Sequence, residues 1–494
     1  MAQPLAGTER PGVSLFWSPD SRSIGFYATN QLKRIDLDTG LVRVLAGAPN
    51  YVGGTWNNEG TILFAPSPST PLMRIGAGGR GLAEATHLDP PRQVSHRFPY
   101  FLPDGRHFIF LALGGLENRG VYIGSLDSRD THRLFEADAP AKFLPPDLVL
   151  FVRDGALLAQ RLNLDTLQME GDPVPVATHV TLTPGNFNAI AASPSRSGLL
   201  AYRANDGARQ SFWVDRVGRQ IGMLGGPDAA QPSSDEGLSP DGRTVVRQRT
   251  VNGNTDIWLI DVERGMPRRF TFEAVRERTP VWSPDGRRIA FASERTGVFD
   301  IYERPVDGTA TERLLVGSAD AKIVEDWSPD GQFVLYTVQN PQTGFDLWVV
   351  PVTGDRKPVP VARMPFAERA GRFSPDGRWI AYSSDETGQG EIYVQPFPGP
   401  GGKVQISTGG GGVAQWRHDG RELFYMGTNN RVMAVAIAIS GSALKAGAPV
   451  ALFTAPAGSG FVASADGQRF LVSTVTTDPA PITVLLNWAG RPAK

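Results

Sequence analysis

The chain has 494 residues, with 49 Lys and Arg against 50 Asp and Glu, so its formal net charge is −1. This balance argues against nucleic acid or an anionic membrane as the main partner. The absence of cysteine excludes disulfides, thiolate zinc sites, iron–sulfur clusters and cysteine nucleophiles. Hydrophobic residues make up 41% of the chain, enough for a buried core, and 56 glycines with 40 prolines predict many turns.

The N-terminal residues show no charged segment followed by an apolar core, as a signal peptide would. No apolar run approaches the ~20 residues of a membrane span. From the residues as written, we expect a soluble chain without an export signal and without membrane insertion.

An aromatic or apolar residue followed by Ser-Pro-Asp-Gly recurs along the chain. The clear copies begin at Trp17, Leu238, Trp282, Trp327 and Phe373, and weaker copies begin at Trp56, Phe101, Phe143, Ala192, Trp416 and Ala463. Measured at the fourth residue of each copy (Asp147 in the gapped copy at Phe143), successive copies are 39 to 48 residues apart, so the eleven copies share a nearly constant period. In this motif Pro presets φ, Asp bonds its own backbone, and Gly takes the positive φ of a tight turn.

β-Branched and aromatic segments follow each turn, as in Arg288–Ala292 and Trp379–Ser383. A second strand that opens with an acid comes next, and then a third. With the strand that leads into the motif, each repeat holds four strands in about 45 residues, which is typical of a β-propeller blade. A sandwich lacks this period, and a solenoid would need helical or leucine-rich segments.

Eleven blades exceed the four to eight of a single ring. The sequence therefore predicts an all-β protein of two tandem propellers with four-stranded antiparallel blades, residues 1–204 and 205–494, and no helix longer than three turns. The seam is expected between Ala201 and Leu224.

The final repeat is expected to supply strands around Phe461–Ala463, Phe470–Ser473 and Ile482–Leu486, and Gln220–Leu224 to complete its blade. This pairing would close a six-bladed second ring. In the first propeller, Gln3–Gly7 aligns with the fourth strand of a blade. The first ring is therefore either five-bladed or, as we favour, an incomplete six-bladed ring with a truncated N-terminal blade.

Several long strings outside the repeat motif are specific, among them His96–Phe108, Phe212–Arg216 and Ile482–Trp488. With the repeats, they resemble the extracytoplasmic region that follows the kinase domain and membrane helix of many bacterial serine/threonine protein kinases. That region is built of TolB-like, WD-repeat-like propeller units, and the resemblance covers residues 2–490. It implies a periplasmic sensor part of a membrane-anchored parent, and it brings no catalytic residues because the kinase motifs are missing here.

Charged residues cluster just before or on the expected inner strands of the second propeller. They are predicted to ring one channel mouth and to bind a polar ligand, the alternative being a solvated rim. Because adjacent strand residues point to opposite faces, only one member of each acidic pair could line the channel. The candidate ligand-binding residues are Asp235, Glu236, Glu277, Arg278, Glu325, Asp326, Glu368, Arg369 and Arg372.

Other patterns are interpreted as structural. Gly76–Gly81 fits G-x-G-x-x-G but lacks a following helix, and Gly409–Gly412 is likewise assigned to a loop. The six histidines lack zinc spacing, and His96 with His107 is expected to form structural hydrogen bonds. Recurring strand-start acids are predicted to accept turn N–H bonds, and the motif tryptophans to pack between blades. The strand-start acids are Asp256, Asp300, Asp346 and Glu391. The motif tryptophans are Trp282, Trp327 and Trp416. No metal or cofactor site is predicted.

The leading hypothesis is a non-catalytic interaction or sensing module that binds a protein, a peptide or a small ligand, and not an enzyme. The alternative is a propeller hydrolase or lyase that uses acids at the channel mouth. A pure scaffold cannot be separated from a binding module by sequence. The chain is expected to be extracytoplasmic if it belongs to a membrane-anchored parent, and cytoplasmic if expressed as written.

Overall fold

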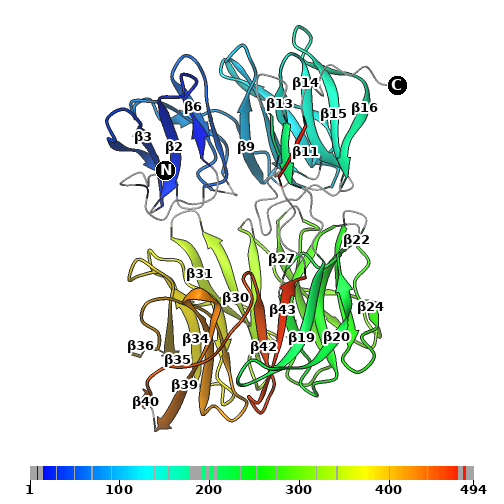
Figure 1. Cartoon of the computed structure of the whole chain (residues 1–494), viewed down its shortest axis with the longest axis vertical. Helices are drawn as coiled ribbons and strands as arrows, with labels where there is room; N and C mark the ends of the chain where they lie inside the picture. Colours follow the sequence, from blue (N-terminus) through cyan, green and yellow to red (C-terminus); the bar gives the residue numbers. More distant parts are fainter. Residues whose placement is uncertain are drawn as a thin grey trace. The chain divides into compact units, whose positions relative to one another are not determined.

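The computed structural model describes most of the chain. The described residues are 8, 15–28, 30–48, 51–67, 70–90, 92–114, 116–137, 139–153, 156–178, 192–194, 200–203, 208–233, 235–251, 254–273, 275–296, 298–318, 320–340, 343–399, 401–441, 443–476 and 482–485. Gln3–Gly7, the predicted orphan strand, lies outside them. Contacts divide the chain into two compact units, residues 1–206 with 479–494 and residues 207–478 (Figure 1).

The described residues are all-β, as predicted. They contain no α-helix, and their helical turns are two 3-10 segments, η1 (Leu116–Asn118) and η2 (Thr428–Asn430). None of these helices has the length and the apolar character needed to span a bilayer.

Five antiparallel sheets make up the described part of the first unit. In sequence order their strands are β1 (Phe16–Trp17), β2 (Ser23–Ala28), β3 (Gln31–Asp36) and β4 (Val42–Gly47); β5 (Gly54–Trp56), β6 (Thr61–Phe64), β7 (Met73–Gly76) and β8 (Ala83–Glu84); β9 (Ser95–Phe101), β10 (His107–Leu113), β11 (Gly120–Ser125) and β12 (Ser128–Phe135); β13 (Lys142–Leu144), β14 (Leu148–Arg153), β15 (Ala156–Asn163) and β16 (Gln168–Thr178); and β17 (Ala192–Pro194), β18 (Leu200–Arg203) and β44 (Ile482–Leu485).

Six antiparallel sheets make up the described part of the second unit. Their strands are β21 (Glu236–Leu238), β22 (Thr244–Val251), β23 (Asn254–Asp261) and β24 (Pro267–Arg269); β25 (Glu277–Trp282), β26 (Arg288–Ser293), β27 (Asp300–Pro305) and β28 (Arg313–Val316); β29 (Lys322–Trp327), β30 (Phe333–Asn340), β31 (Gly344–Pro351) and β32 (Val359–Ala362); β33 (Arg369–Phe373), β34 (Trp379–Ser384), β35 (Glu391–Pro396) and β36 (Val404–Gln405); β37 (Gly411–Trp416), β38 (Glu422–Gly427), β39 (Arg431–Ser440), β40 (Ala443–Ala446) and β41 (Val450–Thr454); and β42 (Gly460–Ala463), β43 (Arg469–Val475), β19 (Arg209–Asp215) and β20 (Gln220–Asp228).

The last sheet of the second unit joins the two ends of that unit. Its order is β20-β19-β43-β42, with β19 and β43 hydrogen-bonded over seven residue pairs; in Figure 1 the green β19 lies beside the red β43. The prediction that Gln220–Leu224 completes this blade is confirmed, because β20 is its edge strand.

The predicted third strand of this blade is wrong. Residues 482–485 form β44, which pairs with β18 in the first unit, and β19 takes the third position instead. The reason lies in burial. The third strand of a blade packs on both faces, and β19 offers Trp213 and Val214, which are less than 10% exposed. Trp213 belongs to the core shared with the first blade and Val214 to the core shared with the preceding blade. In β44, at its place in the first unit, Ile482 and Val484 are 71% and 52% exposed.

The Ser-Pro-Asp-Gly motif builds one turn by the same bonds each time. In the copy at Trp282, Ser283 Oγ donates to Asp285 Oδ1 (2.5 Å), and the same carboxylate oxygen accepts the N–H of Arg287 (3.0 Å). Ser283 Oγ also accepts the N–H of Arg288 (2.9 Å). Gly286, with φ of 67°, donates its N–H to Ser283 O (2.9 Å). Serine, aspartate and glycine are therefore each required by a specific bond or dihedral.

The proline of the motif contacts the turn of the next blade. A Cβ placed on Gly331 would lie 3.7 Å from the ring of Pro284, which belongs to the preceding blade. Gly377 meets Pro329 in the same way at 3.9 Å. The turns of successive blades thus pack proline against glycine, which explains why the whole tetrapeptide recurs.

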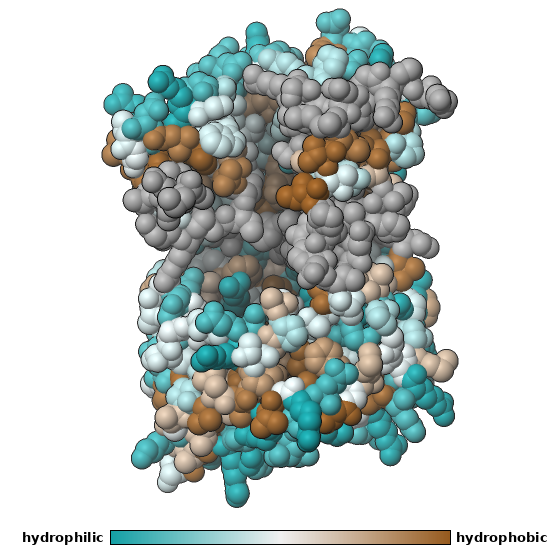
Figure 2. Space-filling view, in the orientation of Figure 1, coloured by the Kyte–Doolittle hydropathy of each residue, from teal (hydrophilic) through white to brown (hydrophobic). Residues whose placement is uncertain are grey.

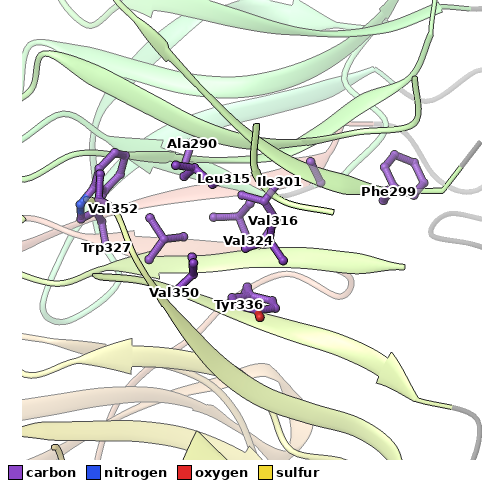
Figure 3. Close-up of a cluster of buried hydrophobic side chains, with 12 residues drawn as sticks. Ala290, Phe299, Ile301, Leu315, Val316, Val324, Trp327, Tyr336, Val350 and Val352 are labelled. Atoms are coloured by element: carbon purple, nitrogen blue, oxygen red, sulfur yellow. The ribbon is translucent and has the colours of Figure 1, made fainter. Parts of the chain in front are cut away.

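The cores lie between neighbouring sheets. Figure 3 shows one such cluster, in which Ala290 and Ile301 from β26 and β27 meet Val324, Trp327 and others from the next sheet. On the face shown in Figure 2, hydrophilic residues are spread over the described surface of the second unit, with hydrophobic ones among them. Burial therefore runs blade to blade around the ring rather than into a single centre.

The motif tryptophans pack between blades as predicted, to different depths. Trp327 is 4% exposed, whereas Trp282 and Trp416 are half-buried against their clusters. The indole N–H of Trp282 donates to Gly237 O (3.2 Å), and that of Trp416 to Arg372 O (3.3 Å), both on the preceding inner strand.

The difference in depth gives a first prediction. Trp327→Ala should lower the free energy of unfolding of the second unit by about 3–5 kcal/mol, because it leaves a cavity in a closed core. Trp282→Ala should cost less, and Asp285→Ala, which removes one part-buried and one exposed turn bond, about 1 kcal/mol. Chemical denaturation followed by tryptophan fluorescence and circular dichroism measures these losses. Equal losses for Trp327→Ala and Asp285→Ala would contradict the packing described here.

Candidate functional site

The nine predicted residues lie on or beside the inner strands of the second unit but do not form one ring of free charges. Glu325, Asp326 and Arg372 come together, and the Asp235 carboxylate acts electrostatically on Glu325. Glu236, Glu277 and Glu368 each belong to a separate buried arrangement. Arg278 and Arg369 extend over the rings of Phe299 and Phe345.

Glu325 is buried and Asp326 is half-buried, and the carboxylates of both accept backbone N–H groups of β33. That only one of them lines the channel stays a prediction. The pairing of β29 with β30 shifts register between Val324 and Asp326, which leaves Glu325 as the extra residue of a β-bulge. A bulge breaks the alternation of side chains along a strand.

The two carboxylates hold the inner strand of the next blade. Glu325 Oε1 accepts from Thr337 Oγ1 (2.6 Å) and from the N–H of Ala370 (3.2 Å). Asp326 Oδ2 accepts the N–H of Phe373 (2.7 Å). Burial raises the pKa of both carboxyls, while the Arg372 guanidinium opposes that rise. Their first role is therefore to join β29 to β33.

Other neighbouring inner strands are also joined by hydrogen bonds from a side chain to the backbone of the next blade. Thr279 Oγ1 accepts the N–H of Val324 (3.3 Å). Gln415 accepts the N–H of Ala463 (2.8 Å) and donates to Phe461 O (2.8 Å). Sequence reasoning missed Gln415, although its place directly before a motif aromatic, which Asp326 shares, is the signal that could have found it.

Glu236 belongs to a network at the point where the ring closes. Its Oε1 accepts from Ser211 Oγ (2.8 Å), Gln231 Nε2 (3.1 Å) and Arg247 Nη1 (3.0 Å), and Gln231 also donates to Ser473 Oγ (3.0 Å). Burial raises the pKa of the Glu236 carboxyl, and Arg247 opposes the rise. The network ties β19 and β43 to the first blade, so this acid is also committed to the fold.

Glu277 shares one guanidinium with a second acid. Arg295 Nη2 lies 2.8 Å from Glu277 Oε1 and 2.6 Å from Glu312 Oε2. The Glu277 side chain is fully buried, and burial, with the nearby Glu312 charge, raises the pKa of its carboxyl to about 7.

Several patterns interpreted as structural behave so. The Gly76–Gly81 stretch is a turn between β7 and β8, and Gly409–Gly412 leads into β37. His96 bonds Thr86 Oγ1 (2.8 Å) and Gln93 Oε1 (3.0 Å), while His107 bonds Asp104 (2.5 Å), so the two histidines have separate partners.

The strand-start acids also bind within the fold, to side chains of the adjacent turn and to groups farther along the chain. Thr296 Oγ1 donates to Asp300 (2.6 Å) and Thr343 Oγ1 to Asp346 (2.8 Å). Asp300 accepts the N–H of Ser318 (3.1 Å), and Glu391 that of Gly410 (2.8 Å). Asp256 pairs with Arg269 (2.8 Å).

Two charged side chains of the predicted set stay exposed, Asp235 and Arg369. A pocket of about 520 Å³ lies elsewhere, at the motif turns, lined by Arg417, His418, Asp419, Ala465, Asp466 and Gln468. Within the described residues, no group of three or more His, Asp or Glu side chains could hold a metal ion.

Residues 230–357 match the family model of the TolB beta propeller domain. A TolB-like β-propeller is present in this chain. The match runs from the network around Glu236 through Glu325 and Asp326 to the loop after β31.

Relatives share parts of the chain. An uncharacterized protein of Agrobacterium fabrum, Atu1656, is 28% identical over 211 residues, 39% of this chain and 69% of that protein. The Tol-Pal system protein TolB of Wolinella succinogenes is 26% identical over 185 residues, 34% of this chain and 42% of TolB. The uncharacterized peptidase YuxL of Bacillus subtilis is 31% identical over 113 residues, 21% of this chain and 17% of the peptidase. The chain thus spans less than two thirds of the length of these last two relatives.

Among solved structures, a putative TolB from Agrobacterium tumefaciens aligns with a TM-score of 0.43 and 17% identity, covering 55% of this chain and all of that one. TolB from Acinetobacter baumannii aligns with a TM-score of 0.39 and 14% identity, over 69% of this chain and 80% of its own.

The hydrogen bond between Asp326 and the N–H of Phe373 gives a second prediction. Asp326→Ala leaves the N–H of Phe373 without its acceptor and should lower the free energy of unfolding by about 1–3 kcal/mol. Asp326→Asn keeps an acceptor oxygen and should lose less. Urea denaturation of the two variants measures the difference, and equal losses would mean that the bond to Phe373 does not matter.

The raised pKa of Glu277 gives a third prediction. A carboxyl that holds its proton more tightly when folded stabilises the protein below its unfolded pKa, and that contribution is lost as pH rises through about 7. Stability of the second unit should therefore fall by about 1–3 kcal/mol between pH 4.5 and 7.5 on this account. Glu277→Gln should flatten that part of the profile. Denaturation midpoints across this range test it, and an unchanged slope in the variant would contradict it.

Proposed function

We propose that the second propeller is a non-catalytic binding module, and that it takes a protein, a peptide or a small ligand with charges of both signs at the mouth formed by the starts of its inner strands. The observation that carries this proposal is that some of the charged residues are bonded within the fold, whereas others are exposed. Glu236, Glu325 and Asp326 form bonds between blades, and Glu277 is paired with Arg295 within its own blade. Asp235 and Arg369, in contrast, are exposed at the same end of these strands.

Charges of this kind favour recognition over catalysis. A general acid or base needs access to the substrate, and the buried carboxylates face strand N–H groups and arginines instead. An exposed aspartate and an exposed arginine can pair with opposite charges on a partner and set its orientation. The resemblance to the sensor regions of bacterial serine/threonine kinases supports a sensing role for the module, in an extracytoplasmic position within a larger membrane-anchored protein.

The second candidate is a propeller enzyme. It is favoured by the match to an uncharacterized peptidase, and by a match to tricorn protease homolog 1 of Streptomyces coelicolor, 31% identical over 77 residues. The matched segments are 17% and 7% of those two proteins. A hydrolase or lyase of this kind would use the Glu325, Asp326 and Arg372 group.

The fourth prediction tests the mouth directly. Peptides selected from a random displayed library on the full chain should bind the wild type, and Asp235→Lys and Arg369→Glu should each weaken binding at least tenfold, as expected for loss of a pair at a polar interface. Fluorescence polarisation with one labelled peptide measures the affinities.

Asp307→Lys is the matched control, because Asp307 is an exposed aspartate at the far end of the blade, in the turn after β27. Affinities unchanged by the two mouth variants would contradict the binding site. Turnover of casein or an ester substrate by the wild type, abolished by Asp326→Asn, would favour the enzyme instead.

A further inference from the structure

Neighbouring blades of the second unit meet at a buried acid on the third strand. Between the sheets of β25–β28 and β29–β32, Asp300 pairs with Lys322, whose Nζ lies 2.7 Å from Asp300 Oδ1. The two side chains are 5% and 1% exposed. Lys322 Nζ also donates to the carbonyl oxygens of Ser318 (3.2 Å) and Asp320 (2.6 Å). The buried acid is thus neutralised by a cation held among backbone oxygens.

The next junction is built on the same plan with the opposite charge. Lys322 stands 22 residues after Asp300, and Glu368 stands 22 residues after Asp346. The N–H of Lys322 donates to the carbonyl of Phe299 (2.9 Å), and that of Glu368 to the carbonyl of Phe345 (2.7 Å), in each case the residue before the acid. Glu368 therefore occupies the position of the lysine.

The acid on the third strand is left without full compensation. Asp346 is completely buried. Its Oδ2 accepts from Thr343 Oγ1 (2.8 Å), and Arg363 Nε lies 3.9 Å away on a side chain that is 55% exposed. Its Oδ1 is buried and has no hydrogen-bond partner among the described residues.

Glu368 is buried beside it, 1% exposed. Its carboxylate accepts the N–H of Met364 (3.1 Å) and, at 3.4 Å, Ser384 Oγ, and within the described residues it forms no ion pair. The Asp346 charge repels it, and Lys403, which attracts it from farther away, is engaged with Glu386. Two neighbouring buried carboxylates are unfavourable when both are charged, and here the nearest ion-pair partner is the exposed Arg363, 3.9 Å from Asp346.

We propose that Asp346 and Glu368 hold a divalent metal cation, with calcium favoured. The charge balance of the preceding junction supports this. Aspartate and lysine cancel there, and replacing lysine with glutamate changes the local charge by two, which a divalent ion restores. The exposed Arg363 neutralises part of this charge at Oδ2 of Asp346, and the buried Oδ1 of Asp346 keeps no hydrogen-bond partner among the described residues.

The available donors suit a hard cation. Carboxylate, hydroxyl and carbonyl oxygens are the ligands of calcium. By spacing, the carbonyls of Met364 and Phe366, 18 and 20 residues after Asp346, correspond to those of Ser318 and Asp320, 18 and 20 residues after Asp300, which accept from the lysine. Nothing in this inference depends on the binding function proposed for the channel mouth.

The test uses the full chain, stripped of metal with a chelator and dialysed. Thermal unfolding is followed in CaCl₂, in MgCl₂ and in KCl of matched ionic strength. Calcium should raise the midpoint of the second-unit transition by about 5 °C at saturation, KCl should not, and calorimetric titration should give one calcium per chain. Midpoints in CaCl₂ and MgCl₂ no higher than in KCl would overturn the proposal.

Glu368→Lys makes the test independent of misfolding, because it recreates the Asp300–Lys322 pair. This variant should lose the calcium response and, without metal, should unfold at or above the temperature of the metal-free wild type. Glu277→Gln is the matched control: Glu277 is a buried acid five residues before its motif aromatic, as Glu368 is, but it is paired with Arg295. Its calcium response should be that of the wild type. A response retained in Glu368→Lys, or lost in Glu277→Gln, would place the ion elsewhere.

Discussion

The antiparallel pairing of β19 with β43 is the interaction on which the second propeller depends. It joins the first strand of the unit to one of its last, so every blade has a neighbour on both faces. The seam is reinforced at both ends. At one end Glu236, Gln231 and Ser473 bond across it. At the other, Arg216 pairs with Glu422 (2.9 Å) and donates to Gly467 O (2.9 Å). Opening the ring would expose sheet edges and several inter-blade cores at once.

The repeat could be predicted because its residues serve bonds inside one turn and a contact with the adjacent turn. Because these requirements are local, the same residues recur in the copies of the motif. The positions of the blade strands can then be predicted from the positions of the turns. The sheet that β44 joins could not be predicted in the same way. Its sequence suits a blade strand, and the choice between it and β19 is made by burial on both faces, which depends on sheets far away in the chain. Ring closure is a competition between segments, and composition does not decide it.

The charged site shows the same limit. Sequence patterns located the acids near the inner strands, but alternation failed at Glu325 because a bulge shifts the register there. The partners were also out of reach, since the N–H groups that bind Glu325 and Asp326 lie about one repeat farther on. A charge without a partner on its own strand can be bound by the next blade, as Glu325 and Asp326 are. What remained predictable was the end of the blade at which the charges gather.

In a repeat protein, the departures from the repeat tell more than the repeat itself. Each junction must solve the same packing problem, so a residue that differs at one junction is either compensated nearby or reserved for another task. At the turn of the Trp416 copy, Arg417 and His418 replace Ser and Pro, and Arg417 is compensated by Asp419 and by Glu422 (2.7 Å). At Glu368 the substitution reverses a buried charge beside Asp346, and the described side chains supply no equal and opposite change. Such a departure inside a closed ring must be neutralised, because the intact neighbouring junctions keep the blade from rearranging around it. Either burial raises the pKa until the carboxyl holds a proton, as at Glu277, or a cation binds, as we propose for Asp346 and Glu368.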